Sequence, residues 1–217
     1  MKKPAQGFSL IELVIAVSLA SFVLVGVATI AAQMARSQLD GIRSGTVSGW
    51  AAASYMAMAK EIEEGNVLAY PIANGAAADS LIICKNWSRS MVTMPSAGRL
   101  DTSAAVAVIQ YCLDTSGTDA VLRRYANVGF GVTCPAVASP VACVAAPAGT
   151  WTENGVVGFR VEKIGGANLF LRDNGIGGVR LSYVIGNQVA TTNQPVVKFT
   201  QFNFGIAMQK QFSSPVD

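Results

Sequence analysis

The sequence predicts an α+β fold, in which a long N-terminal helix packs on an antiparallel β-sheet domain. Residues 8–32 form an unbroken apolar run in which Glu12 is the only ionisable residue. Beyond residue 65, short stretches alternate apolar and polar side chains and are separated by glycine-rich turns, a pattern typical of half-buried strands. The 217 residues leave room for one domain of ordinary size after the helix.

The apolar run is long enough to cross a membrane. At about 1.5 Å per residue, a helix over residues 8–32 would be roughly 37 Å long, more than the hydrocarbon core of a bilayer. It is also longer than the apolar part of an ordinary secretory signal, which has about 7–15 residues. A plain anchor has no use for Glu12, because an acidic side chain in the membrane costs about 2.5–3.5 kcal/mol. The run therefore predicts a membrane-spanning helix whose one carboxylate has a function.

The order of the N-terminal residues is specific. Lys2 and Lys3 lie in a short leader that ends at Gly7, Phe8 opens the apolar run, and Glu12 follows one helical turn later. This arrangement resembles the prepilin signature of type IV pilins and of the pseudopilins of type II secretion. The resemblance implies that a prepilin peptidase cuts after Gly7 and methylates the new N-terminus at Phe8. It also implies that Glu12 neutralises the N-terminal amine of a neighbouring subunit during assembly.

The same resemblance implies a location and partners. Lys2 and Lys3 favour a cytoplasmic leader, so the chain beyond the span is exported from the bacterial inner membrane and later enters a pilus or pseudopilus. The implied partners are the prepilin peptidase, an inner-membrane assembly platform and other pilin or pseudopilin subunits, which bind through the N-terminal helix. The expected regions are a cleaved cytoplasmic leader at 1–7, a transmembrane half-helix at 8–32, an exported half-helix at 33–65 and a periplasmic β-rich, pilin-like domain at 66–217.

The exported half of the helix carries two sets of residues. Proline is absent from residues 33–64, and four large apolar residues recur at spacings that predict one buried face. A row of small residues every four positions lies beside that face. This row predicts either a groove in which a helix or sheet packs, or a weak helix that frays, because each glycine costs about 1 kcal/mol. The large residues are Leu39, Ile42, Trp50 and Ile62; the small ones are Gly41, Gly45, Gly49, Ala53 and Ala57.

The remaining chain predicts hairpins and two regular strands. A first hairpin joins residues 104–113 to 120–125 and resembles the strand–turn–strand of larger minor pilins and J-type pseudopilins, with Arg123 and Arg124 on opposite faces of a solvated edge. A second hairpin joins 156–164 to 169–172. Two strands near the C-terminus alternate apolar and polar residues. Their predicted core positions are Val179, Leu181, Tyr183, Ile185, Phe202, Phe204, Ile206 and Met208.

All four cysteines follow the apolar run, which agrees with an oxidising compartment such as a periplasm. Four cysteines allow three pairings. The favoured pairs are Cys134–Cys143, which would close a short proline-containing loop, and Cys84–Cys112, which would join two strands. Residues 129–150 would then be a surface loop held by a disulfide. No Cys-x-x-Cys motif and no histidine occur, so a metal site is not predicted.

Composition also limits the function. Without histidine the chain has no Ser/His/Asp or Cys/His catalytic arrangement, and no cofactor motif occurs, so an enzyme is not predicted. The net charge is +3, of which the leader supplies two charges, so nucleic acid is not predicted as a direct partner. The preferred function is a structural subunit of a type IV pilus, a minor and tip-proximal pilin. The alternatives are a pseudopilin of a type II secretion system and a membrane-tethered periplasmic binding domain.

Overall fold

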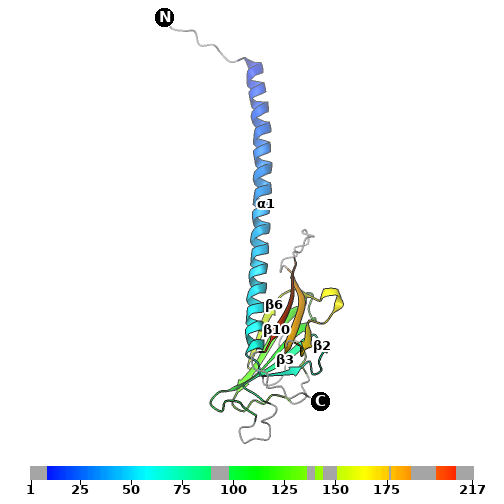
Figure 1. Ribbon diagram of the computed structural model, residues 1–217. Helices are drawn as coiled ribbons and strands as arrows, with labels where there is room; N and C mark the ends of the chain where they lie inside the picture. Colours follow the sequence, from blue (N-terminus) through cyan, green and yellow to red (C-terminus); the bar gives the residue numbers. More distant parts are fainter. Residues whose placement is uncertain are drawn as a thin grey trace. The chain divides into compact units, whose positions relative to one another are not determined.

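The computed structural model describes residues 9–88, 98–135, 140–143, 151–175, 177–186 and 199–208. The chain divides into two compact units, residues 1–45 (unit 1) and 46–217 (unit 2), and helix α1 contributes to both. The elements, drawn in Figure 1, are α1 (Leu10–Glu63), β1 (Val67–Tyr70), β2 (Ala77–Ala78), β3 (Ser80–Lys85), β4 (Val106–Asp114), β5 (Val121–Gly129), β6 (Glu153–Gly158), β7 (Val161–Glu162), the 3-10 helix η2 (Ile164–Gly166), β8 (Phe170–Asp173), β9 (Gly178–Gly186) and β10 (Phe199–Ala207).

Unit 2 contains two antiparallel sheets beside the last part of α1, which confirms the predicted α+β class. The first sheet has the order β1-β3-β4-β5-β6, and the second has β10-β9-β8-β2 with β7 also paired to β9. The first predicted hairpin is confirmed as β4–β5, closed where Asp114 pairs with Val121. The second predicted hairpin is wrong, because β6 pairs with β5, whereas β7 and β8 both pair with β9. A glycine-rich turn in the sequence predicts a change of direction but not which strands pair. Here the turn near η2 connects β7 and β8, which both pair with β9 and not with each other.

The C-terminal part of α1 packs through a stripe with helical spacing. Ala51, Met58 and Ile62 are fully buried in the core of unit 2, and Ser54 is nearly so. The predicted face is wrong for the three other large residues. These side chains are exposed, at 54% for Leu39, 67% for Ile42 and 62% for Trp50. With about 100° of rotation per residue, Ile62 lies about 120° around the helix from Trp50, so the two cannot share a face.

The second sheet supplies the other half of this core. The alternating residues of β9, from Val179 to Ile185, are all buried as predicted, and so are Phe202, Ile206 and Met208 on and just after β10. Phe204 is 36% exposed, and its ring stacks on Tyr55 of α1 with centroids 4.2 Å apart. Each large apolar side chain buried here contributes about 1.5–3 kcal/mol. The helix therefore covers one face of this core.

Polar contacts fix α1 to the first sheet. Arg124 on β5 donates to the Glu61 carboxylate, with Nη2–Oε1 at 2.7 Å and Nε–Oε2 at 3.0 Å, and the Tyr111 hydroxyl donates to the same group. Arg123, on the opposite face of β5, pairs with Asp114 at 2.6 Å. The arginines do lie on opposite faces, but the predicted solvated edge is wrong, because β5 lies between β4 and β6. Because these ion pairs are partly buried, each charged group needs its partner in this position, and this fixes how α1 and the strands lie against one another.

The opposite face of the first sheet is covered by a segment without regular structure. We call residues 132–135 and 140–143 the strap. Cys84 of β3 bonds to Cys134, and Cys112 of β4 bonds to Cys143. Between them, the fully buried Gln110 side chain accepts from the Val141 N–H and donates to the Val141 carbonyl, both at 3.0 Å. One amide thus satisfies both backbone groups of Val141, as a neighbouring strand would.

The disulfide pairing favoured from the sequence, Cys84–Cys112 with Cys134–Cys143, is wrong. In the β3–β4 register Cys84 pairs with Val108, whereas Cys112 pairs with Ser80. The two cysteines therefore lie four residues apart along the sheet, about 13 Å at 3.3 Å per residue. A disulfide needs Cα atoms about 4.4–6.8 Å apart, and both observed bridges have 5.9 Å. The described residues of the predicted surface loop are held on the sheet at three points, namely the two disulfides and the Gln110 side chain.

The Glu61 contacts generate a pH-dependence prediction. Burial alone would raise the pKa of Glu61, but hydrogen bonds from Arg124 and Tyr111 outweigh it and hold the pKa below its ordinary value of 4.5. This stabilisation is present above about pH 4.5 and is lost as the pH falls through the lower, folded-state pKa. Glu61→Gln should therefore lower the free energy of unfolding by about 1–3 kcal/mol at pH 7, and the deficit should shrink below pH 4. Chemical denaturation of the purified chain at several pH values measures both effects.

The control is Glu63→Gln, in the same helical turn, which should change the free energy of unfolding by less than about 0.5 kcal/mol. A Glu61→Gln deficit of equal size at pH 7 and pH 3 would contradict the role of the carboxylate charge.

Candidate functional site

The start of α1 is capped by the side chain of Glu12, the one acid of the apolar run. The backbone N–H of Ser9 donates to Glu12 Oε2 at 3.0 Å, and the Leu13 N–H donates to the Ser9 carbonyl at 3.2 Å. Ser9 is therefore the N-cap, and Glu12 is the third helical residue that reaches back to it, as in a capping box. The first N–H groups of a helix have no partner within the helix, so the carboxylate satisfies a donor that an apolar environment would leave unpaired.

The Ser-x-x-Glu spacing that produces this contact is visible in the sequence, whereas the family resemblance implies only a contact between subunits for Glu12. The two functions are compatible in geometry. A carboxylate has two acceptor oxygens, and the Ser9 N–H uses one of them. Gly7 and Phe8, the predicted processing residues, lie outside the described residues.

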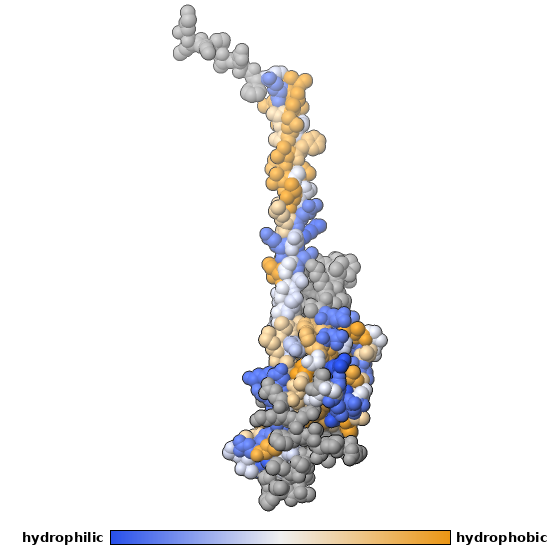
Figure 2. Space-filling view, in the orientation of Figure 1, coloured by the Kyte–Doolittle hydropathy of each residue, from blue (hydrophilic) through white to orange (hydrophobic). Residues whose placement is uncertain are grey.

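Helix α1 exposes its apolar side chains throughout unit 1. An 18-residue window has a mean hydropathy of 2.6 and no residue buried within the chain, and by length and composition α1 could cross a membrane. Figure 2 shows this apolar surface along the first part of the helix. Leu10 is 82% exposed and Phe22 is 77% exposed. Within unit 1, the described side chains alone do not remove this surface from water, so a lipid or protein environment must do so.

Hydroxyl groups in the apolar part of α1 bond back to the helix. Ser18 donates to the Val14 carbonyl at 2.7 Å and Ser21 to the Val17 carbonyl at 2.8 Å. Thr29 donates to the Gly26 carbonyl at 2.8 Å. These bonds satisfy each hydroxyl donor without water, which suits a helix in a hydrocarbon environment. Glu12 differs from these hydroxyl groups, because its carboxylate has a second acceptor oxygen besides the one that accepts from the Ser9 N–H.

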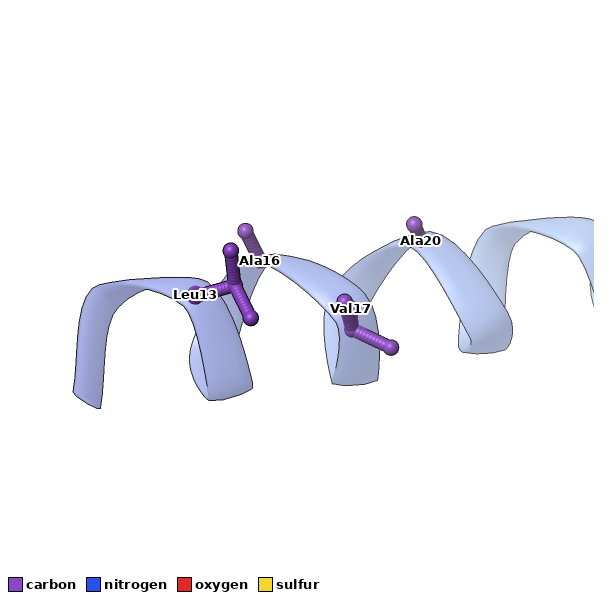
Figure 3. A pocket seen from close by; sticks show the side chains of 4 residues that line it. All are labelled: Leu13, Ala16, Val17 and Ala20. Carbon is purple, nitrogen blue, oxygen red and sulfur yellow. The ribbon is translucent and has the colours of Figure 1, made fainter. Parts of the chain in front are cut away.

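Small side chains leave a shallow depression on the helix one turn after the cap. Leu13, Ala16, Val17 and Ala20 line it, at the spacing of one helix face (Figure 3). The short side chains of Ala16 and Ala20 lie beside the longer ones of Leu13 and Val17. Such a surface permits close approach of another helix.

The small-residue row farther along α1 is exposed. Gly41, Gly45 and Gly49 have no atoms within 4 Å of where a Cβ would lie, and Ala53 and Ala57 are exposed. Helix α1 is continuous over these positions. Within unit 2, Gly49, Ala53 and Ala57 are exposed and lie outside the core formed with the sheets. An exposed row of small residues permits close approach of another backbone, as the predicted groove for a helix or a sheet requires.

The described residues contain no group of three or more His, Cys, Asp or Glu side chains that could hold a metal ion. The cysteines among them are consumed in the two disulfides.

Residues 2–28 match the family model described as the prokaryotic N-terminal methylation motif. The match supports a type IV pilin-like or pseudopilin N-terminus for this segment, and the matched residues include Gly7, Phe8, Ser9 and Glu12. Proteins with this motif are structural rather than catalytic. No curated protein and no solved structure shows significant similarity to the chain.

The cap contact generates a prediction that separates the charge of Glu12 from its hydrogen bond. Glu12→Ala removes the acceptor for the Ser9 N–H, whereas Glu12→Gln keeps an oxygen at the same place. Amide exchange of Ser9, measured by NMR on the full chain in micelles, should accelerate about fivefold in the alanine variant, corresponding to about 1 kcal/mol for a lost cap. The glutamine variant should stay within about twofold of the parent. Equal exchange in all three chains would exclude the cap.

Proposed function

We propose that this chain is a structural subunit of a type IV pilus, a minor and tip-proximal pilin that is cleaved between Gly7 and Phe8. The observation that carries the proposal is the methylation motif at residues 2–28, opening a helix that presents one carboxylate, Glu12, among exposed apolar side chains. The size of the domain beyond the helix supports a minor rather than a bulk subunit. The sequence of the β4–β5 hairpin, which resembles the strand–turn–strand of larger minor pilins, also supports it.

In the proposed assembly, the transmembrane half of α1 packs against helices of other subunits. The Phe8 amine produced by cleavage would directly precede the Ser9 N-cap, near the positive end of the helix dipole, which disfavours a cation. In an apolar bundle an unpaired cation costs several kcal/mol, so a carboxylate from a neighbour at matching depth stabilises it. The Ser9 N–H occupies Oε2 of Glu12 and so orients the carboxylate, leaving Oε1 for that amine. The cap and the contact between subunits can therefore coexist.

The proposed topology places the leader in the cytoplasm and unit 2 in the periplasm, with the prepilin peptidase and the inner-membrane assembly platform as partners. Two disulfides in unit 2 support an oxidising compartment. A pseudopilin of type II secretion is the second candidate, since it shares the same motif. It would be found in a secretion pseudopilus instead of in sheared surface pili. A membrane-tethered binding domain would keep its leader and enter no filament.

Processing gives the first test. The intact mass of the mature protein should correspond to a chain that starts at Phe8 and carries one added methyl group. Gly7 presents no side chain to the peptidase, so replacing Gly7 with leucine should leave a membrane-inserted precursor at the full mass. Ala5→Leu in the leader is the matched control and should be processed. A chain that still starts at Met1 where an active prepilin peptidase is present would contradict the proposal.

Assembly gives the second test, with the two Glu12 variants. Both Glu12→Gln and Glu12→Ala should be cleaved and inserted, because the charge is not needed for either step. Both should co-purify with neighbouring subunits about a hundredfold less than the parent, since losing the partner of a buried cation costs roughly 3 kcal/mol. Because the glutamine variant keeps the cap, its failure would assign assembly to the charge. Processed variants that assemble at the parental level would leave Glu12 without the proposed role.

A further inference from the structure

The two disulfides of unit 2 are interleaved in the sequence. Cys84 is joined to Cys134 and Cys112 to Cys143, so each bridge connects one strand of the first sheet to the strap. The sequence separations are 50 and 31 residues. Each native bridge therefore skips over one cysteine of the other pair.

Pairing each cysteine with the next one along the chain, which we call the consecutive pairing, would close shorter loops. Cys134 and Cys143 lie only 9 residues apart and Cys84 and Cys112 lie 28 apart. If loop closure falls with the three-halves power of loop length, the first pair closes about sixfold faster than Cys112 with Cys143. The second closes about twofold faster than Cys84 with Cys134. During export the cysteines also enter the new compartment in chain order, so Cys84 meets Cys112 first.

The folded sheet is incompatible with the consecutive pairing, because it separates Cys84 from Cys112. In the β3–β4 register Cys84 lies opposite Val108 and Cys112 lies opposite Ser80, about 13 Å apart along the strands. A chain bridged between these cysteines cannot form that register. It also leaves the strap without its two anchors, next to a sheet face that includes Val108 and the buried Gln110.

We propose that unit 2 is a substrate of a thiol–disulfide isomerase in the compartment into which it is exported. This inference rests on the proposed export of the residues beyond the membrane span. The first bridges are made by a disulfide-donating thiol oxidase, which takes up two electrons for each bridge. The isomerase then converts the consecutive pairs into the interleaved pairs by exchange, with no net oxidation.

The exchange is balanced in three steps. The isomerase thiolate attacks Cys84 Sγ and releases Cys112 as a thiolate. The Cys112 thiolate attacks Cys143 Sγ, forming the Cys112–Cys143 bridge and releasing the Cys134 thiolate. The Cys134 thiolate attacks Cys84 Sγ, forming the Cys84–Cys134 bridge and releasing the isomerase thiolate. Formation of the β3–β4 register then holds the product, because Cys84 and Cys112 are separated in it.

The test follows the full chain in cells with and without the isomerase. Free thiols are alkylated, and the protein is digested with trypsin without reduction. The native bridges hold three fragments together, residues 61–85, 100–123 and 125–160. The consecutive bridges link only the first two fragments. Without the isomerase, the ratio of native to consecutive species should fall about sixfold or more, the kinetic advantage of the shorter loop. Elastase, which cleaves between Cys134 and Cys143, separates the native pairing from the third possible one.

The matched control combines Cys112→Ser with Cys143→Ser. This variant retains Cys84 and Cys134, which have only each other, so its oxidation should be the same in both strains whether or not it folds. Native bridges at parental yield without the isomerase would overturn this proposal and leave the proposed export intact. Four alkylated thiols in both strains would contradict export itself, and with it the isomerase step.

Discussion

Strand β4 is buried on both faces, and the rest of unit 2 follows from that constraint. Its odd-numbered residues, such as Tyr111, enter the core that contains Met58 and Ile62 of α1. Its even-numbered residues, such as Val108 and Gln110, face the strap. A helix can cover only one face of a sheet, so the second face needs another cover. The strap has no regular structure to hold its own backbone, and two disulfides with the Gln110 amide hold it in place.

Glu61 and Glu12, both on α1, differ in whether the chain itself supplies a cationic partner for the carboxylate. Glu61 is bound by a cation and a phenol of its own chain, so its charge is used within unit 2. Among the described residues Glu12 forms a hydrogen bond to a backbone N–H and no ion pair with a cationic side chain. A single neutral donor leaves most of the charge uncompensated in an apolar environment. This contrast supports a partner for Glu12 outside the described part of the chain.

Local patterns in the sequence predicted what depends on local physics. The apolar run gave the helix, the turn after Asp114 gave the β4–β5 hairpin, and alternation gave the buried row from Val179 to Ile185. The errors concern contacts between distant segments. The residues next to Cys84 do not show that it lies opposite Val108 rather than opposite Cys112, yet this register is what excludes a Cys84–Cys112 disulfide. In the candidate site, the Ser-x-x-Glu spacing predicts the cap at Ser9. The exposure of the glycine row could not be predicted, because the sequence did not show which face of the helix is buried.

Helix α1 satisfies its polar groups in two different ways along its length. In unit 1 the hydroxyls of Ser18 and Ser21 return to carbonyls of the same helix, which requires no water and no other segment. In unit 2 the hydroxyl of Ser54 donates to the Val157 carbonyl of β6, and Glu61 binds β5. The first arrangement satisfies these hydroxyl groups within the helix, as a lipid environment or contact with another helix requires. The second ties the same helix to its own sheets. A change of environment along α1 is therefore encoded in where its polar side chains find partners, and not only in its hydropathy.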